Sequence, residues 1–169
     1  PRIRVMTRAT CTGWFSDNWL SIVQGNRLYK TRVRSLVVAT GSIDQPSVFR
    51  NNDLPGVMFA TGAQRLIRHY GVPPGRTAVV LASGPAGYLA ALDLAEHGVD
   101  VAAIVDTDQE RPADLATAAV EAHGLRVLRG HAVFEGLPSP NGRHLAGVCV
   151  RPGADASGLE ERREAIECD

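Results

Sequence analysis

The sequence lacks several features that mark specialised classes of protein. Its 169 residues contain 18 Lys plus Arg and 18 Asp plus Glu, so the formal net charge at pH 7 is zero. Without a basic excess, we expect no partnership with nucleic acid or with an anionic membrane surface. No apolar run approaches the ~20 residues that a membrane-spanning helix requires. The length suits one domain, or a domain and a half, with its own hydrophobic core.

Cysteine is scarce, with three residues at positions 11, 149 and 168. They are far apart and form no CxxC pair, so the sequence indicates neither a zinc site nor a dithiol redox pair. An odd number of cysteines in an ordinary composition favours a reducing compartment, and we expect a cytoplasmic protein. The five histidines lie in no recognisable nucleophile motif. The sequence therefore predicts no catalytic residue and no metal site in this chain.

A βαβ pattern occupies the middle of the sequence. Ala78 to Leu81 form a continuous apolar run, which is typical of a parallel strand buried on both faces. Gly84 and Pro85 then suit the start of a helix. A second apolar run, at 101–105, is followed directly by Asp106. Strand, glycine turn, helix, strand and acid in this order are typical of a Rossmann dinucleotide-binding unit.

The glycine turn carries the pattern Ala82-x-Gly84-x-x-Gly87, with alanine at the first glycine position. Backbone N–H groups at a helix start bind a pyrophosphate, and small residues allow it to approach. Asp106 would accept hydrogen bonds from an adenosine ribose and repel a 2′-phosphate, which predicts a preference for NAD(H) over NADP(H). The expected cofactor-binding residues of the unit are Ala82, Ser83, Gly84, Pro85, Ala86, Gly87 and Asp106.

Two other interpretations of the unit remain open at this point. Ala82 could weaken the site, in which case the unit is a scaffold that binds no dinucleotide. The unit could also hold FAD, because FAD and NAD share the adenosine diphosphate half.

An antiparallel β-meander is predicted before the unit, at residues 3–38, with turns at 16–18 and 25–26. Its last strand, at 32–38, would deliver the sequence ATG at its carboxyl end, where a glycine allows close backbone approach to a ligand. A second set of expected cofactor-binding residues therefore comprises Ala39, Thr40 and Gly41.

Two further helices are predicted. One begins in a T-x-x-Q capping box of Thr61 and Gln64 and ends at Gly71, and the other runs from Pro112 to Gly124. Each of the three predicted helices has an expected apolar face. In the helix that ends at Gly71 it consists of Ala63, Leu66, Ile67 and Tyr70. In the helix that follows Gly84 it consists of Tyr88, Leu89, Leu92 and Ala95, and in the helix from Pro112 it consists of Leu115, Ala118, Ala119 and Ala122.

The remaining segments predicted are an ordered connector at 42–58, a third parallel strand at 125–128, a hairpin at 131–150 and a polar loop at 152–163. The chain opens on Pro1 and leads directly into a strand, and its last residues, 164–169, again have a strand-like start. We therefore expect it to be the central piece of a longer polypeptide.

The sequence resembles the flavoproteins with two dinucleotide-binding domains, the pyridine nucleotide-disulfide oxidoreductase type, in which an NAD-type domain is inserted into an FAD domain. LVVATGS at 36–42 is similar to the second FAD-contacting signature of these proteins. NNDLPGVM at 51–58 and YGVPPGR at 70–76 most resemble the α subunit of sarcosine oxidase and its relatives. Those relatives are subunits of opine oxidase, hydroxyproline dehydrogenase and hydrogen cyanide synthase.

This resemblance implies an α/β fold, in which a Rossmann-like parallel sheet is flanked by an antiparallel β-meander from an FAD domain. Residues 1–58 would form the C-terminal part of an FAD-domain segment. Residues 59–169 would form the inserted NAD-type domain, truncated at its C-terminus. NAD would bind in this chain, and FAD only in the full-length protein. Amine oxidation would belong to the flavin of a β-type catalytic subunit in a hetero-oligomer.

Two functions follow from these observations. The first is the central fragment of an FAD- and NAD-dependent amine or amino-acid oxidoreductase similar to the sarcosine oxidase α subunit, with no activity of its own. The alternative is a dinucleotide-binding assembly module without a redox role, which docks a catalytic partner subunit.

Overall fold

The computed structural model describes residues 3–41, 43–153 and 163–169. They belong to two compact units, Pro1–Ile43 and Asp44–Asp169, each of which is described by itself. Within the described residues, no helix is both long and apolar enough to cross a membrane.

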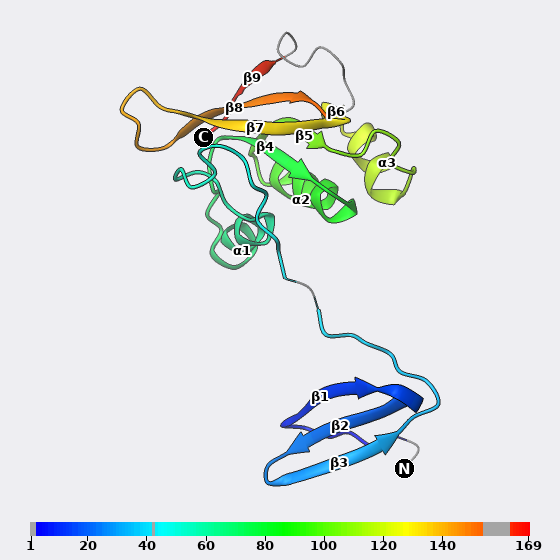
Figure 1. Ribbon diagram of the computed structural model, residues 1–169. Helices are drawn as coiled ribbons and strands as arrows, with labels where there is room; N and C mark the ends of the chain where they lie inside the picture. The colour runs from blue at the N-terminus through cyan, green and yellow to red at the C-terminus, as the bar shows by residue number, and fades with distance from the viewer. Residues whose placement is uncertain (1–2, 42, 154–162) are drawn as a thin grey trace. The chain divides into compact units, whose positions relative to one another are not determined.

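The first unit is an antiparallel sheet of β1 (Ala9–Phe15), β2 (Trp19–Gln24) and β3 (Arg27–Arg32), paired in that order (Figure 1). A short 3-10 turn, Ser16–Asn18, joins β1 to β2, and Gly25, with a φ of 58°, lies in the turn between β2 and β3. An antiparallel meander with turns at both predicted places is therefore confirmed, although its strands do not have the predicted bounds.

The prediction of a strand at 32–38 is wrong. β3 ends at Arg32, and residues 36–41 form neither helix nor strand. Val37 and Val38 are 88% and 66% exposed, so these two apolar side chains are largely uncovered within the described chain. β-propensity reflects how well a side chain fits a pleated, half-buried surface, and these residues have no such surface beside them.

The second unit contains the predicted parallel sheet. Its strands β4 (Thr77–Ala82), β5 (Asp100–Asp106) and β6 (Val127–Arg129) are paired in the order β4-β5-β6. In the register of this sheet, Ala82 pairs with Asp106, and Asp106 pairs with Arg129. The carboxyl ends of all three strands therefore meet at one edge, where ligands bind in open α/β sheets.

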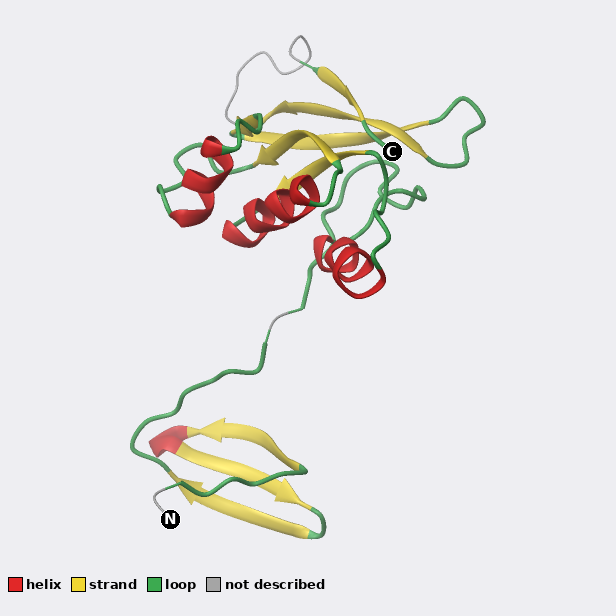
Figure 2. Ribbon diagram, turned by 180° about the vertical axis from the view of Figure 1, so that it is seen from behind, coloured by secondary structure: helices red, strands yellow, loops and turns green. Residues whose placement is uncertain are grey.

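Helices cover one face of this sheet (Figure 2). α2 (Pro85–Glu96) connects β4 to β5, and α3 (Leu115–Ala122) connects β5 to β6. α1 (Ala60–Tyr70) precedes β4 and packs beside α2. The core on this side is formed by residues of the three helices, including Ile67, Tyr88 and Val120, together with residues of the strands.

A second sheet covers the opposite face. It consists of β7 (His131–Pro138), β8 (Leu145–Pro152) and β9 (Glu164–Glu167), all antiparallel. β5 contributes Ala103 and Val105 to the core between the two sheets and Ile104 to the core under the helices, because successive residues of a strand face opposite sides. The predicted hairpin is thus confirmed, whereas most of the predicted loop at 152–163 lies outside the described residues.

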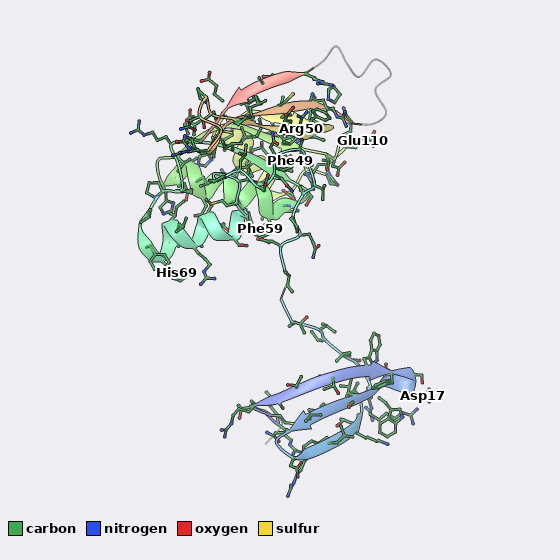
Figure 3. The ribbon with its side chains drawn as sticks, turned by 60° about the vertical axis from the view of Figure 1, so that its left-hand side comes forward. Asp17, Phe49, Arg50, Phe59, His69 and Glu110 are labelled. Carbon is green, nitrogen blue, oxygen red and sulfur yellow. The ribbon has the colours of Figure 1, made fainter. Side chains whose placement is uncertain are left out.

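The connector before α1 is ordered, as predicted. The backbone N–H of Arg50 donates to the carbonyl of Phe134, and the Asn51 side-chain amide donates to the carbonyl of Gly136 at 2.9 Å. Arg50 thus lies against the second sheet, and its guanidinium is 3.3 Å from the carboxylate of Glu135 (Figure 3). From Asp44 onward, the connector therefore belongs to the second compact unit. The predicted division at residue 58 concerns the longer protein and stays a prediction.

The predicted start of α1 is wrong. Phe59 is the N-cap residue of this helix, and no side chain caps it among the described residues. The hydroxyl of Thr61 instead donates to Asp44, and the amide of Gln64 donates to Asp93 of α2. Both side chains are used in tertiary contacts, which the capping-box pattern does not foresee. The predicted end is confirmed, because Gly71 has a φ of 64° and caps the last turn.

The predicted apolar faces are correct only in part. Ala63 and Ile67 of α1, and Tyr88 and Leu92 of α2, are buried. Tyr70, Leu89 and Leu115 are 69%, 53% and 92% exposed, contrary to prediction. The buried residues of α3 are Ala116, Thr117 and Val120. Because α3 has eight residues that are mostly small and apolar, its sequence does not mark which side faces the core.

Candidate functional site

The glycine turn lies at the carboxyl end of β4 and opens α2. Gly84 is the N-cap residue and Pro85 occupies the first turn of the helix. Ser83, Pro85 and Ala86 are exposed, so the turn is accessible from solvent. A Cβ placed on Gly84 would meet no described atom within 4 Å. This open approach to a helix start fits a pyrophosphate, which needs backbone N–H groups and no side chain in its way.

Gly87 serves a different purpose, the packing of α2 on β4. A Cβ placed on Gly87 would lie 2.6 Å from the Cβ and 2.9 Å from the Cα of Ala82. Ala82 is 1% exposed, so its methyl group fills the space that Gly87 leaves free. Alanine thus fits at the first glycine position of the motif because the third position, Gly87, has no side chain.

Asp106 is buried at the end of β5, with no exposed surface. Its carboxylate accepts hydrogen bonds from the Tyr88 hydroxyl at 2.8 Å, from the backbone N–H of Asp108 at 3.0 Å and from Nη2 of Arg111 at 2.8 Å. Nε of Arg111 donates to Oδ2, the carboxylate oxygen that also accepts from Tyr88. A ribose hydroxyl could reach this carboxylate only after one of these donors had moved.

These hydrogen-bond donors stabilise the ionised form of Asp106. Burial raises the pKa of its carboxyl, but the hydrogen bonds from Arg111, Asp108 and Tyr88 outweigh burial and lower the pKa to about 2. The same pairing raises the pKa of Arg111, through its hydrogen bond to Asp106. Burial raises the pKa of the Tyr88 hydroxyl, and its hydrogen bond to Asp106 raises it further. The network therefore contains one carboxylate, one guanidinium and one neutral phenol.

The Asp106 network predicts a specific loss of stability in acid. Unfolded Asp106 binds its proton near pH 4, while the folded carboxylate stays ionised down to about pH 2. Its contribution, about 2 kcal/mol, is present above pH 4 and disappears between pH 4 and about pH 2. The difference in unfolding free energy between the parent and Asp106→Asn should shrink by that amount over this range. Urea unfolding at stepped pH measures it.

The exposed Asp53 provides the control for this measurement. Asp53→Asn should differ from the parent by the same unfolding free energy across the pH range. A constant difference for Asp106→Asn as well would show that the network does not hold the carboxylate in its charged form.

Sequence reasoning did not identify Arg111 and recognised Tyr88 only as an apolar core residue. Arg111 follows Asp106 by a few residues in an irregular loop, in which the Asp108 carboxylate accepts from the backbone N–H of Glu110 at 3.0 Å. Figure 3 shows Glu110 at the edge of the second unit. The available signal in the sequence was a basic residue shortly after the acid that ends β5. Its role becomes clear only from the structure, in which the loop brings Arg111 back to Asp106.

The second set of predicted cofactor-binding residues belongs to a different unit. Ala39, Thr40 and Gly41 are exposed and lie in the first unit, whereas the glycine turn and Asp106 lie in the second. Gly41 has a φ of 81°, a backbone conformation that favours glycine. The structure brings Gly84, Gly87 and Asp106 together at one sheet edge of the second unit.

The second unit also contains a cavity away from the glycine turn. A cavity of about 400 Å³ lies between the connector, α1 and β4, and no residue of the glycine turn lines it. Within the described residues, no group of three His, Cys, Asp or Glu side chains could hold a metal ion. The cysteines are free thiols, and burial raises the pKa of Cys168 to about 11.

Comparison with known proteins identifies relatives of the chain. The alpha subunit of sarcosine oxidase from Rhizobium meliloti (strain 1021) is 33% identical over 167 residues, which cover 90% of this chain and 16% of the relative. Its counterpart from Corynebacterium sp. (strain P-1) is 33% identical, with 85% of this chain and 15% of the relative covered. The chain is a homologue of the sarcosine oxidase alpha subunit. One of the opine oxidase subunits of Rhizobium meliloti (strain 1021) is also related, at 34% identity over 53% of this chain and 19% of the relative.

This homologue of the sarcosine oxidase alpha subunit spans about one sixth of the length of the first relatives it matches. No protein-family model matches it. The solved structures that it resembles include two thioredoxin reductases. The one from T. acidophilum has a TM-score of 0.58 and 14% sequence identity, and the match covers 91% of this chain and 47% of that one. The one from Lactococcus lactis has a TM-score of 0.57 and 14% identity, and the match covers 94% of this chain and 50% of that one. These similarities confirm the predicted α/β fold with its Rossmann-like parallel sheet.

Proposed function

We propose that the second unit of this protein binds a nicotinamide dinucleotide, NAD, at the turn between β4 and α2. The observation that supports this most is the open, exposed helix start at Gly84, combined with the close packing of Gly87 on Ala82. The first feature leaves room for a pyrophosphate, and the second fixes the helix that would bind it. The residues proposed for this contact are Ala82, Ser83, Gly84, Pro85, Ala86 and Gly87.

The proposal extends to the longer protein. The relatives are named as subunits of sarcosine oxidase and opine oxidase, which supports an FAD- and NAD-dependent amine or amino-acid oxidoreductase. In that protein, residues 39–41 would contact FAD, and a β-type catalytic subunit would carry out the amine oxidation. A cytoplasmic location, based on the three free cysteines, is part of the same proposal.

The first experiment measures which dinucleotide the purified 169-residue protein carries and binds. Calorimetric titration with NADH should show one binding site per chain. The visible spectrum should show no stoichiometric flavin, because the described residues contain one glycine turn at a helix start, at Gly84 to Gly87, and FAD needs a turn of its own. A stoichiometric flavin band would mean that this turn is the FAD site, and absence of NADH binding would overturn the proposal.

The alternative, an assembly module without a redox role, is tested on the complete enzyme complex. Reduction of bound NAD during turnover with an amine substrate would support the oxidoreductase. NAD that stays oxidised throughout turnover would support a dinucleotide that serves assembly alone.

A further inference from the structure

The two groups that dinucleotide sites use to distinguish NAD from NADP are both present in this protein, and they are bound to each other. An acid at the end of the second strand accepts hydrogen bonds from the ribose of NAD, and a nearby arginine accommodates the 2′-phosphate of NADP. Here Asp106 is the acid and Arg111 is the arginine, and two hydrogen bonds join them. Paired in this way, neither presents its full charge to a nucleotide.

The pair lies beside the glycine turn. Asp106 is the register partner of Ala82, the residue with which the turn begins. The Arg111 guanidinium lies 5.6 Å from the centre of the Tyr88 ring, and Tyr88 directly follows Gly87 in α2. The Arg111 side chain is only 9% exposed, so it is packed between the first turns of α2 and the end of β5. In a Rossmann unit the adenosine ribose binds at this position.

The other charged residues nearby do not take over the electrostatic role of Asp106 and Arg111. Arg129, beside Asp106 in the sheet, lies 3.5 Å from the carboxylate of Glu121. Asp108 and Glu110 in the loop are exposed to solvent, which screens their charges. Asp106 and Arg111 are instead shielded from water, so the loss of either charge changes the local potential strongly.

We propose that Arg111 is a specificity-determining residue, which weakens discrimination between NAD(H) and NADP(H) by neutralising Asp106. This inference rests on the proposed function, because it concerns the adenosine end of the same site. Without Arg111, the unpaired Asp106 repels a 2′-phosphate. Without Asp106, the unpaired Arg111 attracts one. The two single substitutions therefore move nucleotide preference in opposite directions, which the loss of a merely structural contact does not do.

The experiment measures dissociation constants of NADH and NADPH for four proteins by calorimetry, at about pH 8, well above the ordinary pKa of a carboxyl group. Arg111→Met should change the NADPH/NADH affinity ratio about tenfold in favour of NADH. Asp106→Asn should change it about tenfold in favour of NADPH. The double variant, which is again neutral, should return to the ratio of the parent.

Glu164→Gln is the matched control, because Glu164 forms an exposed ion pair with Arg126 outside the site. Its ratio should equal that of the parent. If one single variant fails to fold, the remaining two variants still test the inference. The other single variant must shift the affinity ratio, and the double variant must keep the ratio of the parent. NADH binding with equal ratios in all four proteins overturns the inference and leaves the proposed function intact. A parent that binds neither nucleotide overturns both.

Discussion

Gly84→Val is expected to abolish measurable dinucleotide binding while leaving the fold intact. Gly84 is the N-cap residue of α2, and its φ of 179° is an extended conformation that valine adopts without strain. Space for the Cβ is free of described protein atoms within 4 Å, so the branched side chain can be accommodated. That same space is where the pyrophosphate would lie. We expect affinity for NADH to fall at least about a hundredfold, or about 3 kcal/mol.

Calorimetric titration of NADH against the parent and the variant measures this loss. Thermal unfolding, followed by the circular dichroism of the helices, verifies that the second unit is unchanged, because α1, α2 and α3 all belong to that unit. If the variant binds NADH as well as the parent does, the dinucleotide binds elsewhere.

Gly87→Val is expected to have the opposite profile, a large loss of stability. The new Cβ would lie 2.6 Å from the Cβ of Ala82, and the contact is with a strand backbone that cannot move without disturbing the sheet. Overpacking of this kind costs about 3 kcal/mol. For a unit of this size we expect the melting temperature to fall by about 10 °C.

Gly62→Val is the control for Gly87→Val. Gly62 lies within α1, and a Cβ on it would meet no described atom within 4 Å. This variant should melt close to the parent, since valine in a helix is no worse than glycine. Equal melting temperatures for Gly87→Val and Gly62→Val would contradict close packing of α2 on β4. The Gly84 and Gly87 variants together would therefore separate the proposed binding role of Gly84 from the packing role of Gly87.

The order of the second unit could be predicted because its signals are local. The apolar run before Gly84, the proline that opens α2 and the acid that ends β5 lie within one short stretch of chain, and their order requires a βαβ unit. The same holds for the hairpin around Gly142, whose φ of 70° requires glycine or a residue tolerant of that conformation. These features depend on backbone geometry that few residue types allow.

Helix faces and side-chain partners could not be predicted in the same way. Leu115 is 92% exposed, whereas Thr117 is buried. The hydroxyl and backbone of Thr117 form the capping box with Asp114, and the face of α3 that includes Val120 packs into the core. Gln64 and Arg68 of α1 both donate to the buried Asp93 of α2, and this contact joins two helices that are distant in sequence. Such pairs depend on how helices pack.

The sequence by itself determined that this chain contains a Rossmann-like unit with a glycine turn at Gly84 and Gly87 and an acid at Asp106. Only the tertiary structure decided that Asp106 is buried against Arg111 and Tyr88, and that residues 36–41 form no strand in the described chain. The physical reason is that backbone conformation is specified by neighbouring residues. The partner of a charge, or of a strand, is specified by whatever the rest of the chain places beside it.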